Sequence, residues 1–167
     1  MKNNHPNIFK SLSFGELTYD GLGRIISEYV KECPDYYYRL MIGTDSLAGQ
    51  AGQAVFVTAI VIHRVGRGGI YFWQKNLNNK IFTLRQRMYQ EAFYSLQVAQ
   101  TLISLKNTSD FMKEKVEIHL DIGEEGETRE MIREIVGMVV ANGFQYQIKP
   151  FSFAASKVAD RHVVLAD

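Results

Sequence analysis

The strongest constraint on the fold is a buried strand that contains a carboxylate. Residues 39–46 form a short apolar run that reaches Asp45, and a loop of small residues, 46–53, follows it. Short apolar runs bounded by Gly-rich segments are typical of buried strands. Because an ionised carboxylate is costly to bury, some other group of the fold must compensate the charge of Asp45.

Three strands are predicted to form an antiparallel meander around this aspartate. They cover residues 36–45, 54–64 and 70–75, and the second is rich in β-branched residues. The segment 65–69 is typical of a hairpin turn. Short connections of this kind join antiparallel strands.

The second half of the chain alternates helices and strands. Thr83 can cap a long helix that begins at Leu84 and ends near Leu105. After a polar connection at 107–115, we expect a strand at 116–122, a helix at 127–142, a strand at 144–149 and a helix from 154 to about 165. This alternation predicts an α/β fold with parallel neighbours in a mixed sheet that helices cover.

The composition is that of one globular domain, residues 1–167. Hydrophobic residues make up 46% and charged residues 22% of the chain. Residues 1–17 show no strong pattern, and Thr18 can cap a helix that runs to about Cys33, so residues 1–34 are predicted to form an N-terminal helical extension. With a single cysteine, no apolar signal segment and no membrane-length apolar run, the chain is expected to be soluble and cytoplasmic.

The charges are unevenly distributed although the net charge is only +1. No Asp or Glu occurs between Ser46 and Gln90, whereas the same stretch contains Arg64, Arg67, Lys75, Lys80, Arg85 and Arg87. A basic stretch of this kind suits a polyanion such as nucleic acid. A solvated hairpin and helix face would give the same pattern, and charge alone does not separate the two interpretations.

Glu91 falls on the apolar face of the long helix, between Leu84 and Ser95. A glutamate on a buried face requires a cation, a metal ion or a proton. A salt bridge to Arg87, one turn earlier, is an alternative that the helix itself leaves open.

The strand at 116–122 places Glu117, His119 and Asp121 on one face and its apolar residues on the other. Asp121 lies at the carboxyl end of the strand, where open α/β sheets usually bind ligands. A partly solvated strand face explains Glu117, whereas the role of His119 stays open. The acidic loop 124–127 is interpreted as a solvated helix N-terminus.

Other chemistries have weaker support in the sequence. No Cys/His spacing is typical of zinc, and neither a Walker loop nor a dinucleotide-binding glycine pattern occurs. Ser46 with His63 or His119 could form a hydrolase pair, but no nucleophile elbow surrounds this serine. By itself, Asp160 would be an ordinary surface aspartate.

The order of strands, helices and acids resembles the ribonuclease H-like fold. More closely, the chain resembles a bacterial YkuK-like family of uncharacterised proteins that are predicted to be related to ribonuclease H. The resemblance rests on Ile42-Gly-Thr-Asp-Ser46, Val65-Gly-Arg-Gly-Gly69, Leu84-Arg-Gln-Arg-Met-Tyr-Gln-Glu-Ala92, Ile118-His-Leu-Asp-Ile-Gly123, Glu127-Thr-Arg129, Gly137-Met138, Lys149-Pro150 and Ala159-Asp160.

The resemblance implies a mixed five-stranded sheet, with the first three strands antiparallel and helices on both faces. It implies that Asp45 lies beside Asp121, that Glu91 lies over both, and that Asp160 joins them from the last helix. In active members of the superfamily such a cluster holds two Mg²⁺ or Mn²⁺ ions for phosphodiester hydrolysis. Hard divalent cations prefer carboxylate oxygens, so the residue types suit this chemistry.

Three functions follow as hypotheses. The first is a metal-dependent nuclease in which these four acids bind metal and Arg64, Arg67, Arg85 and Arg87 contact substrate phosphates. The second is a module that binds nucleic acid or protein without catalysis, and the acid-free stretch from Ser46 to Gln90 supports it equally well. The third is an assembly or regulatory protein whose acids are only structural.

Overall fold

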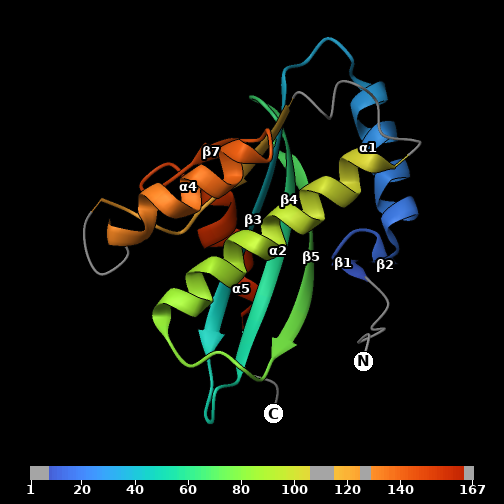
Figure 1. Ribbon diagram of the computed structural model, residues 1–167. Coiled ribbons are helices and arrows are strands. Elements are labelled where there is room, and N and C mark those ends of the chain that lie inside the picture. Colours follow the sequence, from blue (N-terminus) through green and yellow to red (C-terminus); the bar gives the residue numbers. More distant parts are fainter. Residues whose placement is uncertain (1–7, 106–114, 125–128, 164–167) are drawn as a thin grey trace.

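A computed structural model describes residues 8–105, 115–124 and 129–163, of which residues 154–156 are described by their backbone alone (Figure 1). Its centre is a seven-stranded sheet with the order β2-β1-β5-β4-β3-β6-β7. The strands are β1 (Phe9–Ser11), β2 (Gly15–Leu17), β3 (Tyr38–Ala48), β4 (Ala54–Arg64), β5 (Gly69–Asn78), β6 (Val116–His119) and β7 (Gln145–Gln147). The helical elements are α1 (Tyr19–Glu32), α2 (Leu84–Ser104), η1 (Arg129–Met131), α4 (Ile132–Ala141), the π-helical turn η2 (Ala154–Ala159) and α5 (Asp160–His162).

The pairing of the central strands confirms the predicted mixed sheet. Strands β3, β4 and β5 form an antiparallel meander, and β6 runs parallel to β3. Strand β7 in turn runs parallel to β6. The chain leaves β3 toward β4 on one side and returns through α2 to β6 on its other side, so the direction of winding reverses between β3 and β6.

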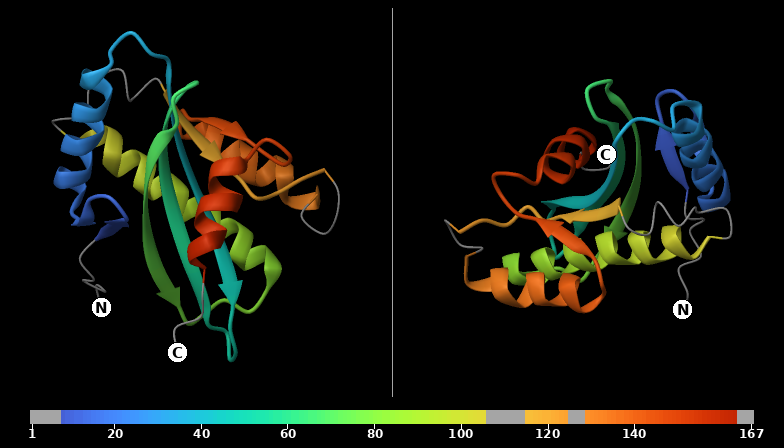
Figure 2. Two further views of the ribbon diagram at one scale, coloured as in Figure 1. Left: turned by 180° about the vertical axis from the view of Figure 1, so that it is seen from behind. Right: turned by 90° about the horizontal axis from the view of Figure 1, so that it is seen from above.

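Helices cover both faces of the sheet, as Figure 2 shows from behind and from above. Helices α2 and α4 lie on one face, above the larger apolar core, which includes Ile42, Ile60 and Leu102. The turn η2 packs on the opposite face, where Ala159 meets a smaller cluster with Val57 and Trp73. Alternate residues of β4 therefore enter different cores, and this strand is buried on both sides.

The helix caps form where the sequence predicts them. The Thr18 hydroxyl accepts a hydrogen bond from the Gly21 amide at the start of α1. At the start of α2, Thr83 and Gln86 bond each other's backbone amides in a capping box. Both caps satisfy amides that a helix leaves unpaired at its N-terminus.

The predicted number of five strands is wrong, because the N-terminal segment contains a β-hairpin. Strands β1 and β2 pair with each other, and Lys10 of β1 pairs with Trp73 of β5, so the hairpin extends the sheet beyond the meander. The predicted N-terminal extension is thus a hairpin followed by α1. Strands of three residues are too short to show an alternating pattern, and the buried ring of Phe9 is the main apolar contact of β1.

Several predicted boundaries also shift. Strand β3 continues three residues past Asp45, whereas β6 ends at His119, two residues before Asp121. The last helix begins as the π-helical turn η2 and ends as α5, so its predicted end near 165 lies outside the described residues. The same holds for the predicted helix start at 127 and for most of the connection 107–115. No helix within the described ranges is long and apolar enough to cross a membrane.

Candidate functional site

The candidate site lies where β3 and β6 stop pairing. The last paired residues are Gly43 and His119, and Asp45 and Asp121 each follow two positions later. In a parallel pair such positions lie opposite each other at the carboxyl edge of the sheet. This edge is also the point where the winding of the sheet reverses, which is the usual ligand site of open α/β folds.

Asp45 lies within β3 and faces the η2 side of the sheet. It pairs directly with Val57, whose side chain belongs to the small core under η2. Burial raises the pKa of Asp45 to about 6, and the nearby carboxylates of Asp121 and Asp160 add to this rise. The Ser46 amide donates a hydrogen bond of 2.8 Å to Asp45 Oδ1 and, with the charge of Arg87, partly opposes it.

Glu91 approaches from α2 on the other face and is only 5% exposed. The Ser46 hydroxyl donates a hydrogen bond of 2.5 Å to Glu91 Oε1, so Ser46 contacts Asp45 through its amide and Glu91 through its hydroxyl. Burial raises the pKa of Glu91 to about 8, and the charges of Asp45 and Asp121 act in the same direction. Arg87 opposes the rise through its charge. Glu91 thus lies on the buried face that its position in the helix predicts.

Asp121 is held by a lysine that the sequence did not identify as a site residue. Lys149 Nζ lies 3.1 Å from Asp121 Oδ2. The Lys149 amide also donates a hydrogen bond of 2.9 Å to the Ile122 carbonyl, which fixes the lysine beside the acid. Within the part of the chain that the structure describes, the buried Oδ1 of Asp121 has no hydrogen-bond partner.

Asp160 is the most exposed acid of the four. It begins α5 on the same face of the sheet as Asp45, and its charge raises the pKa of Asp45. The structure therefore brings Asp45, Glu91, Asp121 and Asp160 into one electrostatic neighbourhood, with Asp45 and Asp160 on one face and Glu91 on the other.

The four acids do not form a ready-made metal cage. Among the described residues, no three Asp, Glu, His or Cys side chains are placed closely enough to hold an ion together. Their chemistry nevertheless fits a hard divalent cation, because all supply carboxylate oxygens and Asp121 Oδ1 has no partner. A cavity of about 10 Å³, which is space for about one water molecule, lies between Glu91, His119 and Asp121. Lys149, which lies at Asp121 Oδ2, would compete with a metal ion for the charge of this carboxylate.

His119 has a structural environment. Its ring is fully buried, hydrogen-bonds the backbone of Ser152 and lies 3.7 Å from Glu117. Burial lowers the pKa of His119. Glu117 forms a two-point ion pair with Arg39, at 2.9 and 2.7 Å, which lowers the pKa of Glu117. His119, whose role the sequence did not assign, thus links β6 to the segment after β7 through Ser152.

The two arginines of α2 differ in their surroundings. Arg87 acts electrostatically on Asp45 and Glu91, and it lines a cavity of about 300 Å³ with Gly52 and Phe82. Arg85 instead forms an exposed ion pair with Glu134, 2.6 Å long. Of the predicted phosphate contacts, Arg87 is therefore the one that the structure brings beside the acids.

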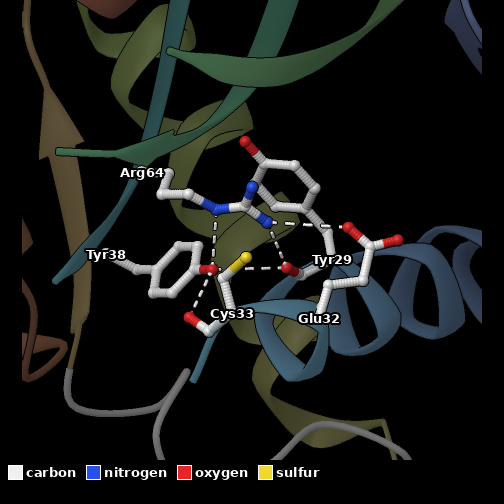
Figure 3. Close-up of polar contacts among 5 residues, drawn as sticks. All are labelled: Tyr29, Glu32, Cys33, Tyr38 and Arg64. Carbon is white, nitrogen blue, oxygen red and sulfur yellow. Dashed lines mark hydrogen bonds and ion pairs between the residues drawn. The ribbon is translucent and has the colours of Figure 1, made fainter. Parts of the chain in front are cut away.

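Arg64 and Arg67 lie at the opposite end of the sheet. Arg64 pairs with Tyr38 in the register of β4 and β3, seven residues from the Val57–Asp45 pair, or about 23 Å along the strand. Its guanidinium donates to the Tyr38 hydroxyl and the Tyr29 carbonyl, both at 2.8 Å (Figure 3). Arg67 follows in the next turn, 5.7 Å from the ring of Tyr36. These contacts attach α1 to the sheet and place both side chains away from the acids.

Comparison with known proteins identifies the family. The family model described as "Ribonuclease H-like" matches residues 22–163. The chain belongs to the ribonuclease H-like family. It is also 30% identical over 166 residues to "Uncharacterized protein YkuK" of Bacillus subtilis (strain 168), an alignment that covers 92% of this chain and 95% of that protein. No solved structure matches the chain.

The ribonuclease H-like match covers the region that carries all four acids. It begins within α1, after the hairpin, and ends just past α5. The hairpin β1–β2 is therefore an addition outside the matched region, on the sheet edge remote from β6. Because one fold supports many functions, membership in the family does not by itself assign an activity to these acids.

Proposed function

We propose that the protein hydrolyses phosphodiester bonds of nucleic acid with divalent metal ions, Mg²⁺ or Mn²⁺, held by Asp45, Glu91, Asp121 and Asp160. The observation that carries this proposal is the convergence of carboxylates where β3 and β6 separate, together with the raised pKa values of Asp45 and Glu91. Burial and mutual repulsion make the ionised forms of these acids unfavourable, and a bound cation would stabilise them. Two divalent ions at such a site would activate a water and stabilise the leaving oxygen.

The protein's own side chains have distinct roles in this proposal. Asp45 and Asp121 bind metal from two neighbouring strands, and Glu91 does so from α2 once its proton has left. Ser46 orients the carboxylates on both sides of β3, through its amide to Asp45 and its hydroxyl to Glu91. Arg87, beside the acids and the adjoining cavity, holds a substrate phosphate.

Cleavage assays with single Asn variants test the proposal. The purified protein with Mg²⁺ or Mn²⁺ should cleave at least one substrate in a panel of single-stranded, double-stranded and hybrid RNA and DNA. Asp45→Asn and Asp121→Asn should each lower the rate by about 100-fold or more, because each removes a charged metal ligand. Asp35→Asn, an exposed change just before the opposite end of β3, is the matched control and should keep full activity. Cleavage that survives both site variants would refute the assignment.

A second candidate is a binding module without catalysis. The Lys149–Asp121 ion pair supports it, because an internal cation compensates one acid without metal. In that case the protein would bind nucleic acid in a salt-dependent manner that requires Arg87, and neither metal nor the Asn variants would change the affinity. Binding assays with and without a chelator distinguish the two functions.

A further inference from the structure

Two exposed phenylalanines lie beside the acidic site, and the proposed function does not use them. Phe151 is 61% and Phe153 is 52% exposed. They belong to residues 149–153, a segment that we call the aromatic loop, which connects β7 to η2. Large apolar side chains that stay in water at such a position are typical of a binding surface.

The aromatic loop is attached at both ends to the segment that carries Asp121. At its start, Lys149 contacts Asp121 through its ammonium group and Ile122 through its amide. Near its end, the backbone of Ser152 hydrogen-bonds His119, and the Ser152 side chain is buried. The two rings flank this buried serine on the exterior, so the loop presents them at a fixed place near the site.

Cations accompany the two rings. Lys149 precedes them, and Lys157 lies 5.8 Å from the centre of the Phe153 ring, within the range of a cation–π contact. Exposed rings interleaved with cations suit a ligand that offers flat apolar surfaces and negative charge together. Nucleobases on a phosphate backbone have both features, and proteins that bind single strands use this combination.

We propose that the aromatic loop binds unpaired nucleotides, with Phe151 and Phe153 stacking on bases next to the scissile phosphate. Bases inside a duplex already stack on their neighbours, so surface rings can reach only single-stranded, looped or terminal nucleotides. The inference rests on the proposed function, because the loop matters for the substrate only if the acids beside it act on nucleic acid. It specifies the substrate class as nucleic acid with unpaired bases, RNA or DNA.

Binding measurements under conditions that prevent cleavage test the inference. Fluorescence anisotropy in EDTA would compare a labelled 12-nucleotide single strand with the duplex of the same sequence, each as RNA and as DNA. The wild type should bind single strands more tightly than duplexes. The variant Phe151→Ala/Phe153→Ala should lose about fivefold or more in affinity per ring for the single strand, with little change for the duplex.

Two control variants separate stacking from general loss of surface. Phe93→Ala removes a ring of equal exposure, 52%, from α2, and it should keep the wild-type affinity. Phe151→Tyr/Phe153→Tyr keeps both rings and should retain most of the binding. Thermal unfolding of each variant checks that the fold is intact.

The outcomes distinguish this inference from the proposed function. If the wild type binds and cleaves nucleic acid but the double alanine variant keeps its single-strand affinity, the aromatic loop has no such role while the nuclease proposal stands. Preference of the wild type for duplexes would overturn the inference in the same way. If the double variant instead changes only the oligomeric state in sedimentation, the rings form an interface between copies. Absence of nucleic-acid binding and cleavage in the wild type would refute both proposals.

Discussion

At the scale of single residues, the site is defined by two acids whose pKa values the fold raises. Asp45 and Glu91 lie on opposite faces of β3, yet burial raises the pKa of both, and the charge of Asp45 adds to the rise at Glu91. Ser46 connects them, since its amide and its hydroxyl donate to one acid each. A protonated Glu91 near neutral pH is the expected consequence for the metal-free protein.

This protonation predicts a pH dependence of stability that depends on Glu91. Its pKa is about 8 in the folded protein and about 4.3 in an unfolded chain, so between these values the folded state holds a proton that the unfolded state has released. The contribution of Glu91 to stability is therefore fully present below about pH 4 and is lost as the pH rises toward 8. Asp45 contributes in the same direction between about pH 4 and 6.

The variant Glu91→Gln should flatten this loss between pH 6 and 8. The stability of this variant relative to the wild type should therefore rise by on the order of 4 kcal/mol between pH 5 and pH 8.5. Urea unfolding across this range in a chelating buffer measures the effect, and Glu28→Gln on the exposed side of α1 is the control. Parallel pH curves for wild type and Glu91→Gln would mean that Glu91 ionises normally in the folded protein.

At the scale of elements, α1 is attached to the sheet by a polar cluster at the end remote from the acids (Figure 3). The Tyr38 hydroxyl accepts a hydrogen bond from Arg64 and donates one of 2.9 Å to the Cys33 carbonyl, at the end of α1. The Arg64 guanidinium also lies 4.1 Å from the centre of the Tyr29 ring. Neutral and charged groups thus satisfy one another in a partly buried region.

The variant Tyr38→Phe should destabilise the protein by about 1–3 kcal/mol, because it removes the hydroxyl that donates to the Cys33 carbonyl and accepts from Arg64. Tyr37→Phe is a matched control at the preceding residue. Tyr37 is 58% exposed whereas Tyr38 is 1% exposed, so loss of the Tyr37 hydroxyl should change stability by less than about 0.5 kcal/mol. Urea unfolding compares the two. Equal effects would show that the cluster does not hold α1.

Local pattern was sufficient for the elements that are long. The apolar run of β4 and the caps Thr18 and Thr83 could be located because their signals lie within a few residues. The hairpin β1–β2 could not, since its strands gain their stability from pairing with β5, more than 50 residues later. Tertiary pairing of this kind leaves no periodicity in a three-residue strand.

The difference between local patterns and tertiary contacts also decides which site residues the sequence could identify. Glu91 and Asp45 could be singled out because each breaks the apolar pattern of its own element. Asp160 breaks no pattern, and only family resemblance suggested it. Arg87 and Arg64 look equivalent in sequence, but the register of β3 with β4 places Arg64 far from Asp45, whereas α2 brings Arg87 near the acids. Lys149 reaches Asp121 only because the chain returns beside β6 after β7.

At the scale of the whole molecule, the mutually repelling acids lie at the edge of the sheet where the direction of winding reverses. Helix α2 packs against β3 and β6 on one face, while η2 packs against β3 and β4 on the other (Figure 2). Elements from both halves of the chain therefore meet at this site. A ligand that relieves repulsion there should stabilise the fold as a whole, because it binds the folded state alone.

Metal binding should accordingly raise the melting temperature. At ten times the dissociation constant, Mn²⁺ would stabilise the protein by about 1.4 kcal/mol, or about 3–6 °C for a chain of this size. Asp121→Asn should abolish the shift. Lys149→Met should increase it at equal Mn²⁺ concentration, since the ammonium no longer competes for Asp121. Lys157→Met removes a cation that lies at the Phe153 ring and should leave the shift as in the wild type. A melting temperature that does not respond to Mn²⁺ in any variant, the wild type included, would mean that the acids have a structural role without metal.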